Sequence, residues 1–177
     1  MIEVTIESIR VSLMNYSRVV VLREADSNRY LPIYIGAPEA DAIAMRLQGV
    51  SVARPMTHDL LANVLQELGG AVDRVVVSGL SNDTFFAQLH VRVNDKELEI
   101  DARPSDALAL AVRSEAPIFV EEAVLEQAGV TLDESSGGEG EDAPRPRGPA
   151  VRPEELEKMS AFKDFIEGLD LDDFDQR

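Results

Sequence analysis

The 177-residue sequence contains no cysteine and no tryptophan, and it has no apolar run longer than six residues. Without thiols the chain cannot form disulfides, thiolate zinc sites, iron–sulfur clusters or a cysteine nucleophile. A membrane-spanning helix needs about 18 apolar residues in succession, so the longest run, Ala107 to Val112, is too short to cross a bilayer. Because the chain has no thiolates, any bound metal ion must be held by carboxylate or imidazole groups.

Positive charge is also scarce, because 17 Lys and Arg side chains stand against 33 Asp and Glu side chains, for a net charge of −16. Half of this charge, −8, lies in the last 47 residues. An acidic surface repels polyanions unless positive charge is gathered locally. The composition therefore excludes a generally basic nucleic-acid binder and makes clustered arginines a requirement for any nuclease.

The first residues do not resemble an export signal. Ile2, Val4 and Ile6 alternate with polar residues, without the basic start and apolar block of a signal peptide. Together with the lack of a long apolar run, this alternation predicts a cytoplasmic protein with no membrane association.

Composition divides the chain into three parts. Residues 1–130 have the apolar content of one globular domain. Residues 131–153 are rich in Pro and Gly and bury too little apolar surface to offset the entropy of ordering, so they predict a flexible linker. Residues 154–177 regain apolar side chains at helical spacing and predict an acidic amphipathic helix. Two uses of this helix stay open: packing on its own domain or a dimer mate, which we favour, and binding another protein.

Hydrophobic periodicity within residues 1–130 predicts strands grouped before and after helices. The expected strands are Ile2–Glu7, Arg18–Leu22, Tyr30–Ile35, Asp73–Leu80, Thr84–Val93, Glu97–Asp101 and Pro117–Val120. The expected helices are Pro38–Gln48, His58–Leu68, Asp106–Ser114 and Glu121–Ala128. Thr57 and Ser105 are the expected N-caps of the second and third helices. This order predicts an α+β fold, with a mixed or antiparallel sheet and several packed helices.

Residues 54–61 and 101–108 repeat one pattern, in which Arg-Pro precedes a hydroxyl-bearing residue and an aspartate at the start of a helix. The residues concerned are Arg54, Thr57 and Asp59 in the first segment and Arg103, Ser105 and Asp106 in the second. A helix start presents unpaired N–H groups, and a nearby guanidinium adds a planar pair of donors, so either segment could bind phosphate. The alternative for each segment alone is structural, with the aspartate stabilising the helix start and pairing with the arginine.

A histidine and several acids could supply hydrolytic chemistry. His58 lies at a predicted helix start and could act as general base or acid near neutral pH. His90 falls within an expected strand and is interpreted as a surface or sheet residue. Carboxylates near element ends could hold Mg²⁺ or Mn²⁺ for phosphodiester hydrolysis. These carboxylates belong to Glu39, Asp59, Asp101 and Asp106.

Four motifs in the same order resemble the bifunctional nuclease (BFN) domain family. They are residues 31–36 with Glu39-Ala40, residues 54–60, residues 101–111 and residues 116–120. The resemblance covers about residues 1–129, and the linker and acidic end resemble the extension of actinobacterial members. It implies an α+β domain, often homo-oligomeric, in a family named for members that degrade both RNA and DNA.

The leading hypothesis is therefore a metal-assisted nuclease that acts on RNA and DNA and forms a homodimer or other homo-oligomer. The expected catalytic residues are His58, Asp59 and Asp106; the expected substrate-binding residues are Arg54, Arg103 and Ser105; the expected ligands of Mg²⁺ or Mn²⁺ are Glu39, Asp59, Asp101 and Asp106. Two alternatives stay open. One is a non-catalytic regulatory or interaction module that uses the acidic tail, and the other is a small-nucleotide phosphohydrolase.

Overall fold

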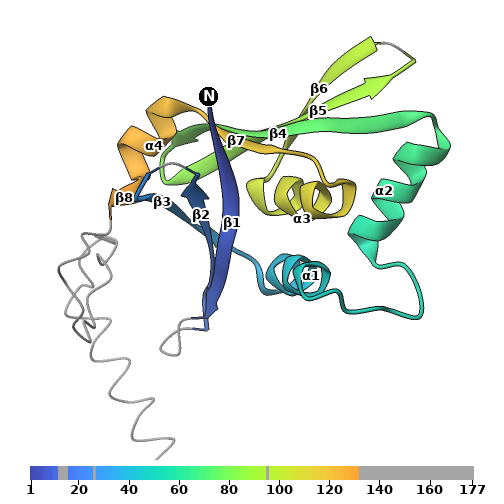
Figure 1. The fold of residues 1–177 in the computed structure, drawn as a ribbon, viewed down its shortest axis with the longest axis horizontal. Helices are drawn as coiled ribbons and strands as arrows, with labels where there is room; N and C mark the ends of the chain where they lie inside the picture. The colour runs from blue at the N-terminus through green and yellow to red at the C-terminus, as the bar shows by residue number, and fades with distance from the viewer. Residues whose placement is uncertain (12–15, 26, 95, 132–177) are drawn as a thin grey trace, which may run out of the picture. The chain divides into compact units, whose positions relative to one another are not determined.

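In the computed structural model, which describes residues 1–11, 16–25, 27–94 and 96–131, eight strands form one sheet in the order β6-β5-β4-β7-β1-β2-β3-β8 (Figure 1). Their bounds are β1 Ile2–Val11, β2 Arg18–Glu24, β3 Arg29–Ile35, β4 Gly70–Ser81, β5 Thr84–Val93, β6 Lys96–Ala102, β7 Ile118–Val120 and β8 Val130–Thr131. The described neighbours pair antiparallel except β4 and β7, which are parallel. The predicted linker and C-terminal helix, residues 131–153 and 154–177, lie outside the described residues except for Thr131.

The described part of the chain also forms four helices: α1 Ala37–Leu47, α2 Thr57–Glu67, α3 Pro104–Ser114 and α4 Glu122–Ala128. Helix α3 contacts α1, α2, β4 and β5, and in Figure 1 it lies between β4 and α1. This central position explains its Ala- and Leu-rich sequence, because small side chains permit close packing on several sides. The predicted α+β class with a mixed sheet is confirmed. None of the helices within the described ranges is long and apolar enough to cross a membrane.

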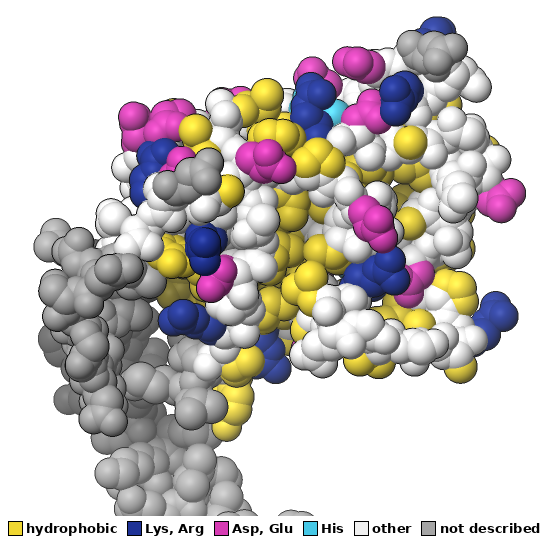
Figure 2. Space-filling view, viewed as in Figure 1, with side chains coloured by type: hydrophobic (Ala, Val, Ile, Leu, Met, Phe, Trp, Pro, Cys, Tyr) yellow, Lys and Arg dark blue, Asp and Glu magenta, His cyan; other side chains and the backbone are white. Residues whose placement is uncertain are grey.

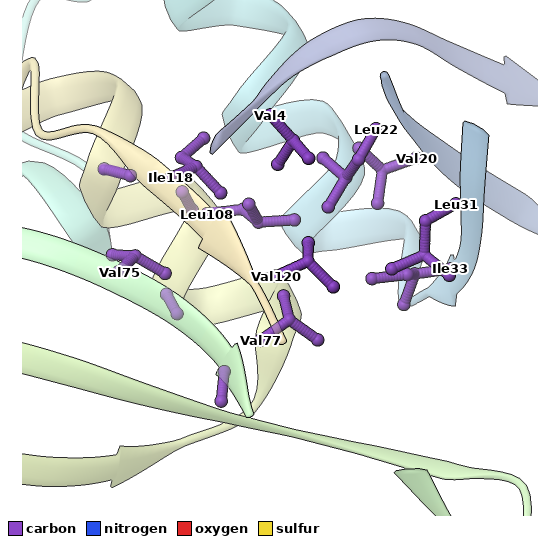
Figure 3. Close-up of a cluster of buried hydrophobic side chains, with 14 of the residues drawn as sticks. Val4, Val20, Leu22, Leu31, Ile33, Val75, Val77, Leu108, Ile118 and Val120 are labelled. Atoms are coloured by element: carbon purple, nitrogen blue, oxygen red, sulfur yellow. The ribbon is translucent and has the colours of Figure 1, made fainter. Parts of the chain in front are cut away.

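The core lies between the sheet and α3 (Figure 3). Alternate residues of β2, β3 and β4 point into it, such as Val20, Ile33 and Val77, and Leu108 of α3 meets them from the helix side. Each of these side chains is almost fully removed from water. Burying a large aliphatic side chain contributes about 1.5–3 kcal/mol to stability, so this layer fixes α3 against the sheet.

The helix starts differ from the predicted caps. Met56 is the N-cap of α2 and Arg103 is the N-cap of α3, so Thr57 and Ser105 are wrong as caps. Proline suits the first helical position because its φ is preset and it lacks an N–H, and Pro104 therefore starts α3 one residue before Ser105. In α2, the backbone N–H of Met56 donates to Asp59 Oδ2 at 2.8 Å, so the aspartate satisfies the helix start in place of a hydroxyl.

Candidate functional site

The starts of α1, α2 and α3 are joined by side-chain hydrogen bonds. Arg103 donates from Nη2 to Glu39 Oε1 at 2.8 Å and from Nε to Asp106 Oδ2 at 2.7 Å. His58 Nε2 lies 3.1 Å from Asp106 Oδ1. These four residues, Glu39, His58, Arg103 and Asp106, are called the Arg103 network below. Residues 64 positions apart in sequence thus meet at one place.

The position of Glu39 depends on the residue that caps α1. Gly36 is the N-cap, and Glu39 is the third residue of the helix. The carboxylate of Glu39 folds back over the Cα of Gly36, where a Cβ would collide with it. A glycine at this cap therefore lets the carboxylate reach Arg103.

Hydrogen bonding determines the charge state of Asp106. Burial raises the pKa of its carboxyl, but hydrogen bonds from Arg103 and His58 and the charge of Arg103 outweigh burial and hold this pKa below its ordinary value. The same contacts raise the pKa of Arg103, first through Asp106 and then through Glu39. An ionised carboxylate only accepts hydrogen bonds, so we assign a proton to His58 Nε2, which leaves Nδ1 of the neutral ring as the proton acceptor.

The network is open to solvent through its arginine. The side chain of Arg103 is 68% exposed, whereas that of His58 is 11% exposed. Arg103 uses Nε and Nη2 as donors to these carboxylates, which leaves Nη1 without a partner among the described residues. An anion in solvent can therefore contact the guanidinium while the carboxylates keep it in place.

A hollow of about 440 Å³ adjoins Arg103. Its walls are residues 33–36 at the end of β3, residues 83–85 at the start of β5, residues 103–105 at the start of α3, and Ser17. Beyond Tyr30, the outer edge of β3 pairs with no strand in the described part of the chain, so this side of the sheet stays open. Ser105, an expected substrate contact, is buried in the wall.

Asp59 takes part in a different set of contacts. Its Oδ1 accepts from Arg113 Nε at 2.5 Å, while Oδ2 accepts from Met56 N–H. The side chain of Arg113 is 6% exposed and also donates to the carbonyls of Ala109 and Ala42. Burial raises the pKa of Asp59, but the bonds from Met56 and Arg113 outweigh it and keep this pKa below its usual range.

Sequence reasoning missed Arg113. It lies in the last turn of α3, where a basic residue is expected simply to complement the helix dipole. Its pairing with Asp59 depends on how α2 packs against α3, which the sequence pattern does not specify.

Two other predicted residues form no hydrogen bond or ion pair with the Arg103 network in the described residues. Arg54 is exposed and lies two residues before the cap of α2, whereas Arg103 is itself the cap of α3. Because of this offset, only one of the two arginines of the repeated motif, Arg103, joins the described hydrogen-bonded network at the three helix starts. Asp101 is exposed near the end of β6, opposite Gln88 of β5. Their roles at a common phosphate or metal site stay predictions.

The predicted metal ligands do not fit a resident divalent cation in this arrangement. A guanidinium lies between Glu39 and Asp106, and Asp59 is taken up by Arg113 and Met56. Within the described ranges, no three His, Asp or Glu side chains are grouped as metal ligands. The donor set therefore favours a salt-bridged network over a metal centre.

This arrangement predicts that the free protein melts at the same temperature in EDTA and in millimolar Mg²⁺ or Mn²⁺. A cation present at 100 times its dissociation constant would stabilise the fold by about 2.7 kcal/mol, and differential scanning calorimetry would detect that easily. A rise of several degrees that disappears in Glu39→Gln would show that the carboxylates rearrange around a metal.

Comparison with known proteins places these residues within a recognised family. The sequence profile of the bifunctional nuclease domain matches residues 20–133, which include the whole Arg103 network. An uncharacterized protein of Mycobacterium tuberculosis is 42% identical over 172 residues, covering 97% of each chain.

Two plant relatives are more distant. "Bifunctional nuclease 2" of Arabidopsis thaliana is 28% identical over 130 residues, which is 70% of this chain and 40% of that protein. "Bifunctional nuclease 1" of Oryza sativa subsp. indica is 23% identical over 117 residues, covering 64% and 35% of the two chains. The similarity to the plant proteins is therefore confined to less than half of their length.

Proposed function

The chain belongs to the bifunctional nuclease domain family, and on that premise we propose that its Arg103 network hydrolyses phosphodiester bonds of RNA and DNA. The observation that carries the proposal is an exposed guanidinium hydrogen-bonded to a carboxylate that also contacts an imidazole. Phosphodiester hydrolysis requires a group that binds the phosphate and a group that moves a proton. The network contains one of each.

Arg103 is the proposed phosphate-binding residue. Its guanidinium would donate to the non-bridging oxygens, whose negative charge grows as the phosphorus becomes five-coordinate. Glu39 and Asp106 hold the guanidinium from two sides, so little of its freedom remains to be lost on binding.

His58 is the proposed general base. Its Nδ1 would accept a proton from a water molecule as the water oxygen bonds to phosphorus, and the bond from phosphorus to the leaving oxygen would break. The imidazolium would then return this proton to the leaving oxygen, which restores the neutral ring. Asp106 orients the imidazole through Nε2 and stabilises its cationic form.

We expect Arg103→Ala to lower kcat/KM for single-stranded RNA and DNA by about 10²-fold, because removing one transition-state donor typically has this effect. Arg92→Ala is the matched control, since Arg92 is also an exposed arginine, 57% exposed, that donates to an aspartate at 2.8 Å. Cleavage of end-labelled strands by purified proteins with equal melting temperatures measures the effect. Equal rates for Arg103→Ala and the wild type would place the activity elsewhere.

A small-nucleotide phosphohydrolase is the second candidate, and the hollow beside Arg103 favours it because about 440 Å³ suits a mononucleotide. Nucleotide monophosphates and cyclic nucleotides in the same assay separate the two functions. Release of phosphate or opening of the ring without cleavage of strands would support this candidate over the nuclease.

We also propose a homodimer or other homo-oligomer, supported by apolar side chains on the exposed face of α2. They belong to Leu60, Leu61 and Val64, and to Leu68 at the C-cap of the helix. Apolar groups clustered on one helix face are typical of protein interfaces. Light scattering should give a multiple of the 19.4 kDa chain mass that falls to the monomer in Leu61→Glu/Val64→Glu. A wild-type monomer at micromolar concentration would contradict this.

A further inference from the structure

The hollow beside Arg103 has an aromatic wall that phosphodiester hydrolysis alone does not use. Tyr34 of β3 and Phe85 of β5 both line it, and the side chain of Tyr34 is 61% exposed. Along β3, Ile33 is buried in the core while Tyr34 faces outward. The Tyr34 hydroxyl makes no hydrogen bond within the described residues, so hydrogen bonding does not account for the position of this ring.

The charge of the surroundings limits what this hollow can bind. The first 130 residues carry a net charge of −8. On the face shown in Figure 2, the described Lys and Arg side chains are scattered singly or beside acidic ones rather than joined into a basic band. A ligand that depends on many phosphate contacts would gain little here, since such binding requires several arginines or lysines along the backbone.

We infer that the hollow takes one unpaired nucleobase stacked on Tyr34, so that the protein acts on single-stranded rather than duplex nucleic acid. This inference rests on the proposed hydrolysis at Arg103. Stacking on an aromatic ring supplies affinity that does not depend on net charge or on base identity. A base within a duplex is stacked on both faces and cannot enter without being flipped out.

Two walls of the hollow differ in charge, which orients the nucleotide. Arg103 lies on the wall formed by α3, and Asp83 lies on the wall formed by the turn between β4 and β5. Asp83 is the only acidic residue among the described lining residues. The phosphate therefore belongs at the Arg103 side, where Asp106 holds the guanidinium, and the base belongs on Tyr34.

Binding of fluorescent single strands tests this inference. The probes are a short oligothymidylate and an abasic strand with the same number of phosphates, and gel analysis confirms that each stays intact during the measurement. We expect Tyr34→Ala to weaken oligothymidylate binding on the order of 10-fold and Tyr34→Phe to leave it nearly unchanged, because the ring rather than the hydroxyl stacks. Abasic-strand binding should be the same in all three proteins.

Phe86→Ala is the control variant, because Phe86 is an aromatic residue of β5 that is 45% exposed and does not line the hollow. Its oligothymidylate affinity should match the wild type, and a duplex of the same sequence should bind the wild type less tightly than the single strand. Equal weakening of the two single strands by Tyr34→Ala, or no weakening at all, would overturn the base-binding assignment.

Binding and cleavage are measured separately, so the inference and the proposed function can fail independently. If the wild type cleaves RNA and DNA but Tyr34→Ala binds oligothymidylate normally, the base site is wrong and the hydrolysis stands. If no cleavage occurs while the Tyr34-dependent binding persists, the hollow is a nucleobase-binding site and the nuclease assignment is wrong.

Discussion

Asp106→Asn is expected to lower the rate of RNA and DNA cleavage by about 10²–10⁴-fold, the range typical for loss of general acid–base catalysis. An amide has no negative charge to stabilise an imidazolium, and its NH₂ group can turn toward His58 Nε2 and favour the other tautomer. The first effect makes the imidazolium less stable, and the second removes the proton acceptor that we assign to Nδ1. The amide also weakens the hold on Arg103, which donates to the second oxygen of Asp106.

A double variant tests whether His58 and Asp106 act together in catalysis. If His58 and Asp106 act as one unit, His58→Ala should cost a similar factor, and the double variant should be no slower than the slower single variant. His90→Ala is the matched control, because His90 is the other histidine of the chain and contacts Arg74 through Nδ1. Losses that multiply in the double variant would mean that the two residues act independently.

Mild acid should not reduce this activity through protonation of Asp106. Because the folded-state pKa of its carboxyl is below the ordinary value of about 3.9, the carboxylate stays charged down to that value and below. Protonation of Asp106 therefore should not limit cleavage at any pH between about 5 and 8. A pH–rate profile that loses activity with an apparent pKa between 4 and 5 in the wild type, and not in Asp106→Asn, would contradict this.

Local sequence signals predicted most of the elements and one part of the site. The β5 bounds, Thr84–Val93, match the prediction, and the helices begin and end within two residues of it. The ion pair between Arg103 and Asp106 follows from positions three apart at a helix start. Contacts between residues within one helical turn could therefore be predicted from their spacing in the sequence.

Contacts between distant segments could not be derived in this way. β7 lies between β4 and β1 and pairs parallel with the former, which joins the two predicted groups of strands into one sheet. The repeated Arg-Pro motif predicted that Arg54 and Arg103 bind a common phosphate, but Arg54 lies two residues before the cap of α2, whereas Arg103 is itself the cap of α3. The contact between His58 and Asp106 spans 48 positions and depends on how α2 packs against α3.

The same packing gives Asp59 a role in stability. Asp59→Asn should lower the free energy of unfolding by about 3 kcal/mol, because removing one partner of a buried ion pair leaves an uncompensated charge. We take the low end of the usual range since Asp59 is 27% exposed, although Arg113 is almost fully buried. Asp73→Asn is the control: its partner Arg92 is largely exposed, and such surface pairs contribute about 0–1 kcal/mol.

Urea unfolding at several pH values tests both the size and the sign of this effect. The folded-state pKa of Asp59 is depressed, so its stabilisation is fully present above the unfolded value of about 3.9 and is lost as pH falls through the folded pKa. The difference between wild type and Asp59→Asn should therefore be constant from pH 5 to 8 and shrink below about pH 4. Both carboxylate oxygens already have partners, so kcat at a temperature where the variant stays folded should be retained. A fully folded Asp59→Asn protein with kcat reduced 100-fold would instead make Asp59 a catalytic residue.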